Sequence, residues 1–437
     1  MTAFPAICGH IAFNIIAGWA LLGLCRHERT WAETLSLSVL LGMYAETLSV
    51  ATLMFLGVPL SVAGLVVLAL AGGGAAVALY RGRLRLPRVF IERLRWYEWL
   101  LLITVGEKVF FALWQLTRTH VYFDDALTHW SGRARSLFGG VNWSLDPASP
   151  FFLAGHVGSL HYPLQTILWR ALTARLSGVW DDAIARADGL IFFAVLVSAI
   201  WLAVWRFSRV RWLAAGAAFT ASAVPLHAWH AAAGYSDIAV EVFAVAALAA
   251  LLRGEWLLGG VMVAGTAWSK NDGLVLYFPA LLIAAGLLQG GRTLRDGGQS
   301  VGRFLAGFAT LAPWLIFKYA HSLGVSPGQN RLGWHSDAPG LFWNTVMMGP
   351  TSGILWVCVF ACAIWTGRAM SRDTTGRALL AAFLTSLGGI VFVFGFTDAY
   401  AFLKDQTTIH RSMMQFSGVA ILIVTYGIWL KLRTEAS

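Results

Sequence analysis

The chain has few charged residues for its length. Asp, Glu, Lys and Arg make up 12% of its 437 residues, whereas a soluble globular protein carries about 25%. Hydrophobic residues make up 58%, and the mean hydropathy is +0.66. A water-soluble chain of this composition would have too little polar surface to face the solvent. The composition therefore excludes an ordinary soluble domain and indicates an integral membrane protein.

Cysteine is also scarce, and a cleavable leader is not evident. The four cysteines all lie within apolar runs, so they do not form a disulfide framework and say nothing about the redox compartment. The N-terminus lacks both a basic region and a small-residue cleavage site. We therefore expect a retained first helix rather than a signal peptide.

Basic residues outnumber acidic ones, with a formal net charge of +10. In a soluble protein this excess would favour nucleic acid as a partner. Here the basic residues fall in short clusters between apolar runs, which is typical of cytoplasmic loops of membrane proteins. We therefore expect membrane lipids, and no nucleic acid, as partners.

Thirteen apolar segments are candidates for membrane-spanning helices, each of which needs about 20 residues. They are residues 6–25, 34–57, 59–80, 98–116, 188–205, 212–226, 237–252, 256–269, 273–289, 304–320, 350–366, 378–396 and 413–430. The sequence therefore predicts an all-α polytopic membrane protein with about thirteen transmembrane helices.

The basic residues predict the orientation of these helices. If the arginine-rich loop 81–97 is cytoplasmic and the loops alternate, the cytoplasmic side holds 20 of the 32 Lys and Arg residues. This excess places the N-terminus outside and the C-terminus in the cytoplasm. The outer side then has one long loop, 117–187, and two shorter ones, 321–349 and 397–412.

The long outer loop contains two segments that are amphipathic at helical period, 125–138 and 163–176. Both are too polar to span a bilayer. We expect them to be helices that lie at the membrane interface.

Acidic residues at the outer ends of spans are candidates for catalysis. Asp124 and Asp125 are adjacent where the fourth span ends, and a cationic partner or a raised pKa there suits a general base. Asp237 opens the seventh span, directly after Tyr235. The alternative is that Asp124 or Asp125, and likewise Asp237, serves only as the N-cap of the helix that follows it. A cap does not explain Glu241, which lies one turn further into the apolar helix.

Cationic residues on the same side are candidates for anion binding. Lys270 and Asn271 lie in a tight outer connection, where a lysine beside an amide suits a phosphate. The alternative is a lysine that extends its amine to the interface. His410 and Arg411 precede the last span on the outer side, where arginine is disfavoured unless it has a function.

Aromatic and histidine residues complete the outer loops. His161 and Tyr162 precede the second amphipathic segment, and aromatic faces suit sugar rings, although aromatic belts are ordinary at membrane interfaces. His227 and His230 lack the tight spacing of metal ligands, and no DxD motif is present. We expect no metal and no other cofactor.

Together these motifs resemble the GT-C superfamily of membrane glycosyltransferases, which includes protein O-mannosyltransferases and lipid A aminoarabinose transferases. The matching elements are Phe123-Asp124-Asp125, His161-Tyr162-Pro163, Gly234-Tyr235-Ser236-Asp237, Lys270-Asn271-Asp272-Gly273 and Arg411. The resemblance covers 98–320 and, loosely, 397–430. It implies a catalytic module at 98–320 with the outer loop 117–187, preceded by N-terminal helices at 1–97 and followed by C-terminal helices at 321–437. The three spans before the module depart from the usual arrangement of the family.

The resemblance also implies a reaction. Such enzymes move a sugar from a polyprenyl-phosphate carrier to a hydroxyl of a glycan, lipid or protein outside the cytoplasm. Asp124 would be the base, Asp125 or Asp237 would orient the acceptor or the base, and Lys270 and Arg411 would hold the leaving phosphate. The remaining contacts to phosphate or substrate would come from His410, His161, Tyr162, Tyr235 and Asn271. We expect such a protein in a bacterial inner membrane, with its site facing the extracytoplasmic side.

Two other classes remain open. An O-antigen ligase or polymerase would use outer-loop arginine and histidine rather than an acidic base, and His410 and Arg411 are compatible with that. A secondary transporter would place ionisable residues near the midplane, often on broken helices of an inverted repeat. In this sequence most acidic residues are expected at one surface of the membrane rather than at its midplane, and no internal repeat is evident.

Overall fold

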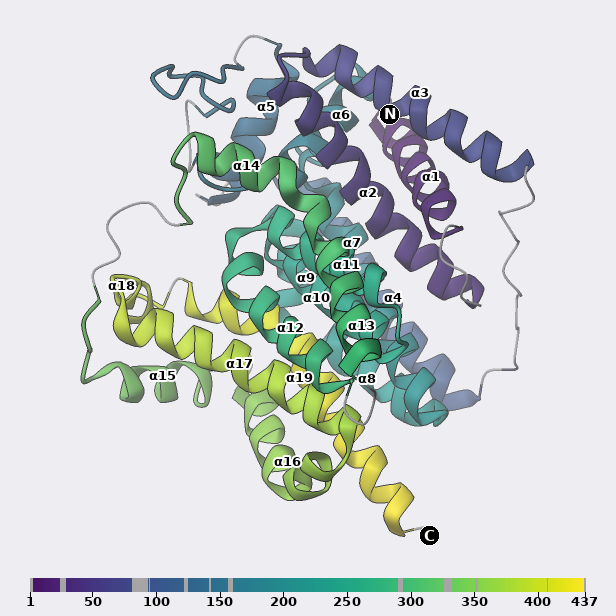
Figure 1. Cartoon of the computed structure of the whole chain (residues 1–437), viewed down its shortest axis with the longest axis vertical. Helices are drawn as coiled ribbons and strands as arrows, with labels where there is room; N and C mark the ends of the chain where they lie inside the picture. The colour runs from purple at the N-terminus through teal and green to yellow at the C-terminus, as the bar shows by residue number, and fades with distance from the viewer. Residues whose placement is uncertain are drawn as a thin grey trace.

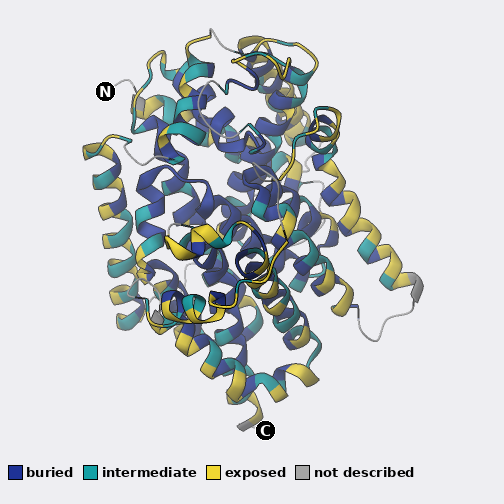
Figure 2. Ribbon diagram, turned by 90° about the vertical axis from the view of Figure 1, so that its left-hand side faces the viewer, coloured by how far each residue is buried: buried dark blue, intermediate teal, exposed yellow. Residues whose placement is uncertain are grey.

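A computed structural model describes most of the chain. The described residues are 3–23, 29–80, 93, 95–121, 125–140, 143–155, 160–289, 294–325, 332–349, 353–406 and 408–435. All the elements named in these ranges are helices. Buried residues concentrate along the helices in the middle of the bundle, and exposed residues lie on the outer helices and loops (Figure 2).

Nine helices in the described ranges are long and apolar enough to cross a membrane. Seven of them are single helices: α1 (Ala3–Leu22), α2 (Trp31–Phe55), α3 (Leu60–Tyr80), α4 (Trp96–Arg118), α16 (Gly353–Arg372), α17 (Thr374–Phe396) and α19 (Ile409–Glu435) (Figure 1). The eighth is α7 (Ala187–Ser208) together with the preceding turn η2 (Ile184–Arg186). The ninth is α13 (Leu294–Phe308), which continues through η4 (Ala309–Leu311) into α14 (Ala312–Ala320). A bent pair, α9 (Pro225–Ala233) and α10 (Asp237–Leu252), is a tenth candidate. The protein is therefore an all-helical integral membrane protein.

The expected count of thirteen spans is not confirmed. Three predicted spans correspond to short helices: α8 (Arg211–Ala223), α11 (Trp256–Ser269), and η3 (Gly273–Tyr277) with α12 (Phe278–Leu287). A helix of 14 residues, such as α11, is about 20 Å long and does not cover the roughly 30 Å of a hydrocarbon core. Most of α11 is buried, so its apolar composition serves packing inside the bundle.

Glycines allow the closest helix crossings. An added Cβ on Gly18 of α1 would overlap the backbone carbonyl of Ser38 in α2, and one on Gly42 of α2 would overlap that of Asn14. Gly260 of α11 and Phe304 of α13 make the same kind of approach. Small residues at crossings are the usual means by which membrane helices associate, because lipid provides no hydrophobic drive between them.

The N-terminal helices are also joined to the rest by buried polar contacts. Glu46 of α2 accepts hydrogen bonds from His10 at 2.8 Å and from Asn14 at 2.7 Å. His10 also pairs with Thr173 at 2.7 Å, and Trp169 donates to Asn14 at 2.9 Å. One hydrophobic core runs from α1 to α19. The predicted segment boundaries at 97/98 and 320/321 therefore do not interrupt the core.

The amphipathic segments of the long loop form η1 (Ala126–Gly132) with α5 (Arg133–Phe138), and α6 (Gln165–Ser177). The expected helix at α6 is present, and residues 165–174 are all buried, so the helix packs against other parts of the protein on all its faces. Its polar face is instead met by polar partners. Thr166 pairs with Ser236 at 2.8 Å, and Arg170 donates to Asp188 at 3.0 Å.

Arginine-rich helix ends meet at one end of the bundle, which we call the basic end. Arg211 at the start of α8 donates to Glu98 near the start of α4 at 2.6 Å. Arg253, at the end of α10, donates to Glu33 near the start of α2 at 3.1 Å. We call the opposite end, where α4 ends and α7, α10 and α19 begin, the site end.

The crossing of α1 and α2 yields a test of stability. Gly42→Ala should lower the free energy of unfolding by about 1–3 kcal/mol, because the new methyl group overlaps the α1 backbone. Thermal unfolding in detergent measures the change. Gly73→Ala in α3, where an added Cβ has nothing within 4 Å, is the control and should not lower the melting temperature. Equal melting temperatures for the two variants would contradict this packing.

Candidate functional site

A fully buried carboxylate, Asp237, lies at the centre of the site end. Its Oδ1 accepts hydrogen bonds from Lys270 Nζ at 2.9 Å and from Gln415 Nε2 at 2.6 Å. Its Oδ2 accepts from Arg411 Nη2 at 3.0 Å. Two cations and one amide therefore saturate this carboxylate, which fixes their positions relative to one another.

Asp237 reaches this position because the chain bends by 119° between α9 and α10. Gly234, at the bend, takes a φ of +87°, which favours glycine. Arg186 packs beside it and donates to the carbonyl of Ala232 at 3.0 Å and to that of Leu116 at 2.7 Å. Arg186 thus satisfies carbonyls at the ends of α9 and α4. The bend directs the first turn of α10 toward the two cations.

Lys270 follows the last residue of α11 in an extended conformation. The chain returns at once into η3, and an added Cβ on Gly273 would overlap the backbone of Thr266, so glycine permits this tight return. Lys270 Nζ lies 2.9 Å from Oδ2 of Asp272 in the same turn. Burial lowers the pKa of Lys270, but Asp237 and Asp272 raise it more, so it lies above its ordinary value. The amine therefore carries a charge at neutral pH.

Two partly exposed carboxylates flank the cations. The Asp125 side chain is 34% exposed and accepts a hydrogen bond from Arg411 Nη1. The Asp272 side chain is 29% exposed and also accepts from Gln415 Nε2 at 3.0 Å. Together with the buried Asp237 they make three carboxylates around two cations. An incoming ligand can reach the outer two but not Asp237.

Two tyrosines lie beside these charges. The guanidinium of Arg411 lies 4.3 Å from the ring centroid of Tyr235, which is cation–π distance. The ring of Tyr162 lies 5.5 Å from that of His129. Burial raises the pKa of Tyr162, and the smaller opposing effect of Lys270 does not reverse this, so the phenol is neutral. The tyrosines therefore offer apolar faces and neutral hydroxyl groups next to the ionic groups.

A second set of contacts ties the adjoining loops together. Lys318 Nζ donates to the carbonyl of His161 at 2.9 Å, to Asn271 Oδ1 at 3.1 Å and to the carbonyl of Gly324 at 2.8 Å. Asn271 Nδ2 donates to the His161 carbonyl at 3.1 Å and to that of Val325 at 2.9 Å. Burial, then Lys318 and other nearby cations, lower the pKa of His161 to about 4. Its imidazole is therefore neutral at pH 7.

The residues that the sequence singled out are placed as follows. Asp125, Asp237, Lys270 and Arg411 meet and, with Asp272 and Gln415, form what we call the charged cluster. Tyr235 and Tyr162 lie beside it, and His161 and Asn271 belong to the adjoining loop contacts. His410 lies against Gly349, since a Cβ added there would be 3.4 Å from His410 Cε1. Asp124 lies outside the described residues.

Several members of the site were not among the predicted site residues. Gln415 lies one turn after Arg411 in an apolar span, and a polar residue in such a position marks a site. The same signal applies to Lys318 near the end of α14. His230 is fully buried, and its Nδ1 lies 3.8 Å from Asp237 Oδ2, but its ring nitrogens have no hydrogen-bond partner among the described residues. Nothing in its sequence context distinguishes it from a packing residue.

No group of three or more His, Cys, Asp or Glu within the described part of the chain is placed to hold a metal ion. Comparisons with protein-family models, curated proteins and solved structures give no match.

The role of Asp237 in holding the charged cluster predicts a large loss of stability on its removal. Asp237→Asn should lower the free energy of unfolding by about 3 kcal/mol, because the buried Lys270 and the half-buried Arg411 lose their shared partner. Thermal unfolding in detergent measures this effect.

Asp272→Asn is the matched control for that experiment. Its partly exposed carboxylate should contribute less than about 1 kcal/mol. The central role of Asp237 fails if the two variants lose equal stability.

Proposed function

We propose that the chain is a membrane glycosyltransferase that moves a sugar from a polyprenyl-phosphate carrier to a hydroxyl of a glycan, lipid or protein on the extracytoplasmic side. The single observation that carries this proposal is the convergence of Lys270 and Arg411 on Asp237, with Arg411 also paired to the partly exposed Asp125. Two fixed cations among three carboxylates match a reaction in which a phosphate leaves and a hydroxyl loses its proton, and the phosphate would take the place of Asp125 and Asp272 on the cations.

The cations suit the departing phosphate. As the bond between the anomeric carbon and the phosphate oxygen breaks, negative charge grows on that oxygen, and Lys270 and Arg411 would stabilise it. Asp237 keeps both cations in place and is too buried and saturated to meet an acceptor. We therefore assign Asp237 a positioning role rather than a catalytic one.

The carboxylates at the start of the long loop suit the acceptor. Asp125 is engaged by Arg411, and the adjacent Asp124 is the proposed base. Asp124 would take the proton of the acceptor hydroxyl as its oxygen forms the new bond to the anomeric carbon. Attack opposite the leaving phosphate would invert the configuration at that carbon. Tyr162 and Tyr235 would contact the sugar or acceptor.

The proposed orientation follows from the two ends of the bundle. The basic end contains ion-paired arginines from several helix ends, and such an excess is typical of the cytoplasmic side. The charged cluster lies at the other end. The site would therefore face the extracytoplasmic side, with the N-terminus outside and the C-terminus in the cytoplasm.

A secondary transporter is the second candidate, and one observation favours it. The break between α9 and α10 lies at Asp237, and broken helices often line the substrate sites of transporters. Purified protein in liposomes separates the two functions. Transfer of radiolabelled sugar from polyprenyl phosphate to an acceptor supports the enzyme, and uptake of a free solute without transfer supports the transporter.

Removing the charge of Lys270 should weaken use of the donor. Lys270→Gln keeps a hydrogen-bond donor for Asp237 but loses a charge-assisted contact to phosphate, so donor affinity should fall about tenfold or more. Affinity for the acceptor should change little. Binding of radiolabelled polyprenyl-phosphate sugar measures the first effect, and steady-state kinetics measure the second.

Lys404→Gln is the matched control, because Lys404 lies in α18 (Tyr400–Lys404), outside the charged cluster, with its amine 5.9 Å from the centroid of the Tyr400 ring. It should bind the donor as the wild type does. Unchanged donor affinity in Lys270→Gln would contradict the phosphate role.

Removing the proposed base should slow transfer without preventing donor binding. Asp124→Asn should lower the rate of transfer about 100-fold or more, in line with the loss of a general base. Asp146→Asn, in an exposed part of the same loop, is the control and should keep wild-type turnover. Full activity in Asp124→Asn would refute the assignment and favour a ligase-like use of Arg411 and His410.

A further inference from the structure

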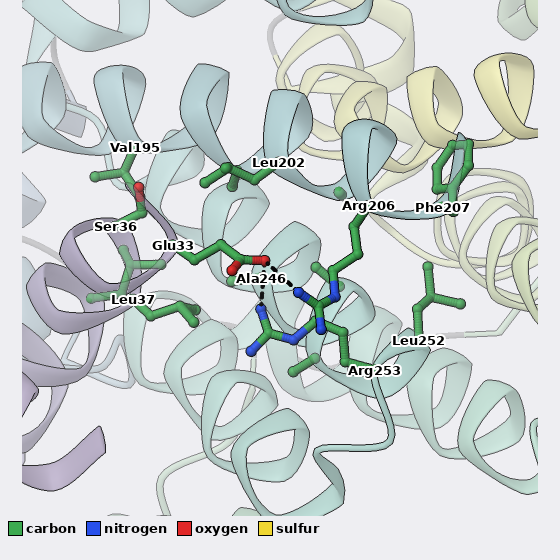
Figure 3. Close-up of a pocket in the computed structure, with 15 residues that line it drawn as sticks. Glu33, Ser36, Leu37, Val195, Leu202, Arg206, Phe207, Ala246, Leu252 and Arg253 are labelled. Carbon is green, nitrogen blue, oxygen red and sulfur yellow. Dashed lines mark hydrogen bonds and ion pairs between the residues drawn. The ribbon is translucent and has the colours of Figure 1, made fainter. Parts of the chain in front are cut away.

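A cavity lies between α2, α7 and α10, on the basic side of the bundle and away from the charged cluster. It has about 780 Å³ of space free of atoms, part of it open to solvent. It follows α7 from Val195 to Phe207 (Figure 3). Twelve residues of helix correspond to about 18 Å, which is somewhat more than half of a roughly 30 Å hydrocarbon core.

The lining of this cavity changes character along its length. Most of the residues in its walls are aliphatic or aromatic, among them Leu40, Leu202 and Ala246. Ser36 is the only uncharged polar residue in the lining. Its charged residues are Glu33, Arg206 and Arg253. Figure 3 shows Glu33 ion-paired with both Arg206 and Arg253. The cavity is therefore mainly apolar, and its charged groups gather toward the basic end of α7, with Phe207 and Leu252 beyond them.

Glu33 brings the two arginines together. Its Oε1 accepts from Arg253 Nη1 at 3.1 Å and from Arg206 Nη1 at 3.4 Å. Its Oε2 accepts from the backbone of Thr30 at 2.9 Å, as part of the helix cap. Two guanidinium groups therefore lie beside one carboxylate that also serves the backbone.

The wider ion-pair network leaves this end positive. Arg253 also pairs with Glu255, which accepts from Arg29 Nη2 at 2.7 Å. The three arginines and two glutamates sum to one positive charge. Arg206 is the most accessible of them, with 42% of its side chain exposed, whereas that of Arg253 is 9% exposed. An anion at Arg206 would neutralise the network.

We propose that this cavity binds an anionic phospholipid, with one acyl chain along α7 and the headgroup phosphate at Arg206 and Arg253. A free anion would use the arginines but leave the apolar walls unfilled. A zwitterionic lipid would fill the walls but bring a cationic group to a site that is already positive. The combination of apolar walls and a net positive ion-pair network fits an anionic lipid best. This proposal is independent of the glycosyltransferase function.

Binding of lipid by the full-length protein in neutral detergent tests the proposal. The probes are phosphatidylglycerol, phosphatidylcholine and inorganic phosphate, and the shift in melting temperature with probe concentration gives an apparent affinity. Phosphatidylglycerol should bind wild-type protein at least tenfold more tightly than phosphatidylcholine, and inorganic phosphate should give no comparable shift. Equal affinity for the two lipids, or an equal shift with inorganic phosphate, would overturn the proposal.

Three variants locate the site. Arg206→Gln removes the accessible charge and should weaken phosphatidylglycerol binding about tenfold. Ala203→Leu places a larger side chain in the cavity and should weaken it similarly while leaving the arginines intact. Arg209→Gln removes an exposed charge three residues away, outside the lining, and should bind as the wild type does. If Arg209→Gln loses as much affinity as Arg206→Gln, the attraction is general surface electrostatics and the proposal fails.

Discussion

The contact of Asp237 with Lys270 and Arg411 is the interaction on which the site end depends. Like charges brought together in a low-dielectric interior repel each other, and each is costly to bury alone. The carboxylate of Asp237 lies between them and binds both, with Gln415 completing its coordination. The start of α10, the end of α11 and the start of α19 therefore meet at one point.

The same constraint explains several features that would otherwise look unrelated. The bend before α10 exposes the first turn of that helix to the cations, and Arg186 satisfies the carbonyls that the bend leaves open. Gly273 permits the tight return after Lys270. At the basic end Glu33 plays a comparable role for Arg206 and Arg253. In both places a carboxylate in a helical bundle positions two cations.

Part of this arrangement could be predicted from the sequence. The apolar runs indicated a helical membrane protein, and alternation of spans put Asp237, Lys270 and Arg411 on one side, where the structure brings them together. The number of spans could not be predicted, because short buried helices such as α11 are as apolar as spanning ones. The burial of α6 was also missed, since its polar face is satisfied by residues as distant in the chain as His10.

If the cations held by Asp237 form a phosphate site, polyprenyl phosphate should bind there, which an experimental structure of the protein with that lipid bound would show. We expect the phosphate to lie within about 3 Å of both Lys270 Nζ and the Arg411 guanidinium, with Asp237 still bound to both residues. A phosphate bound elsewhere, with Lys270 and Arg411 still closed by carboxylates, would contradict it.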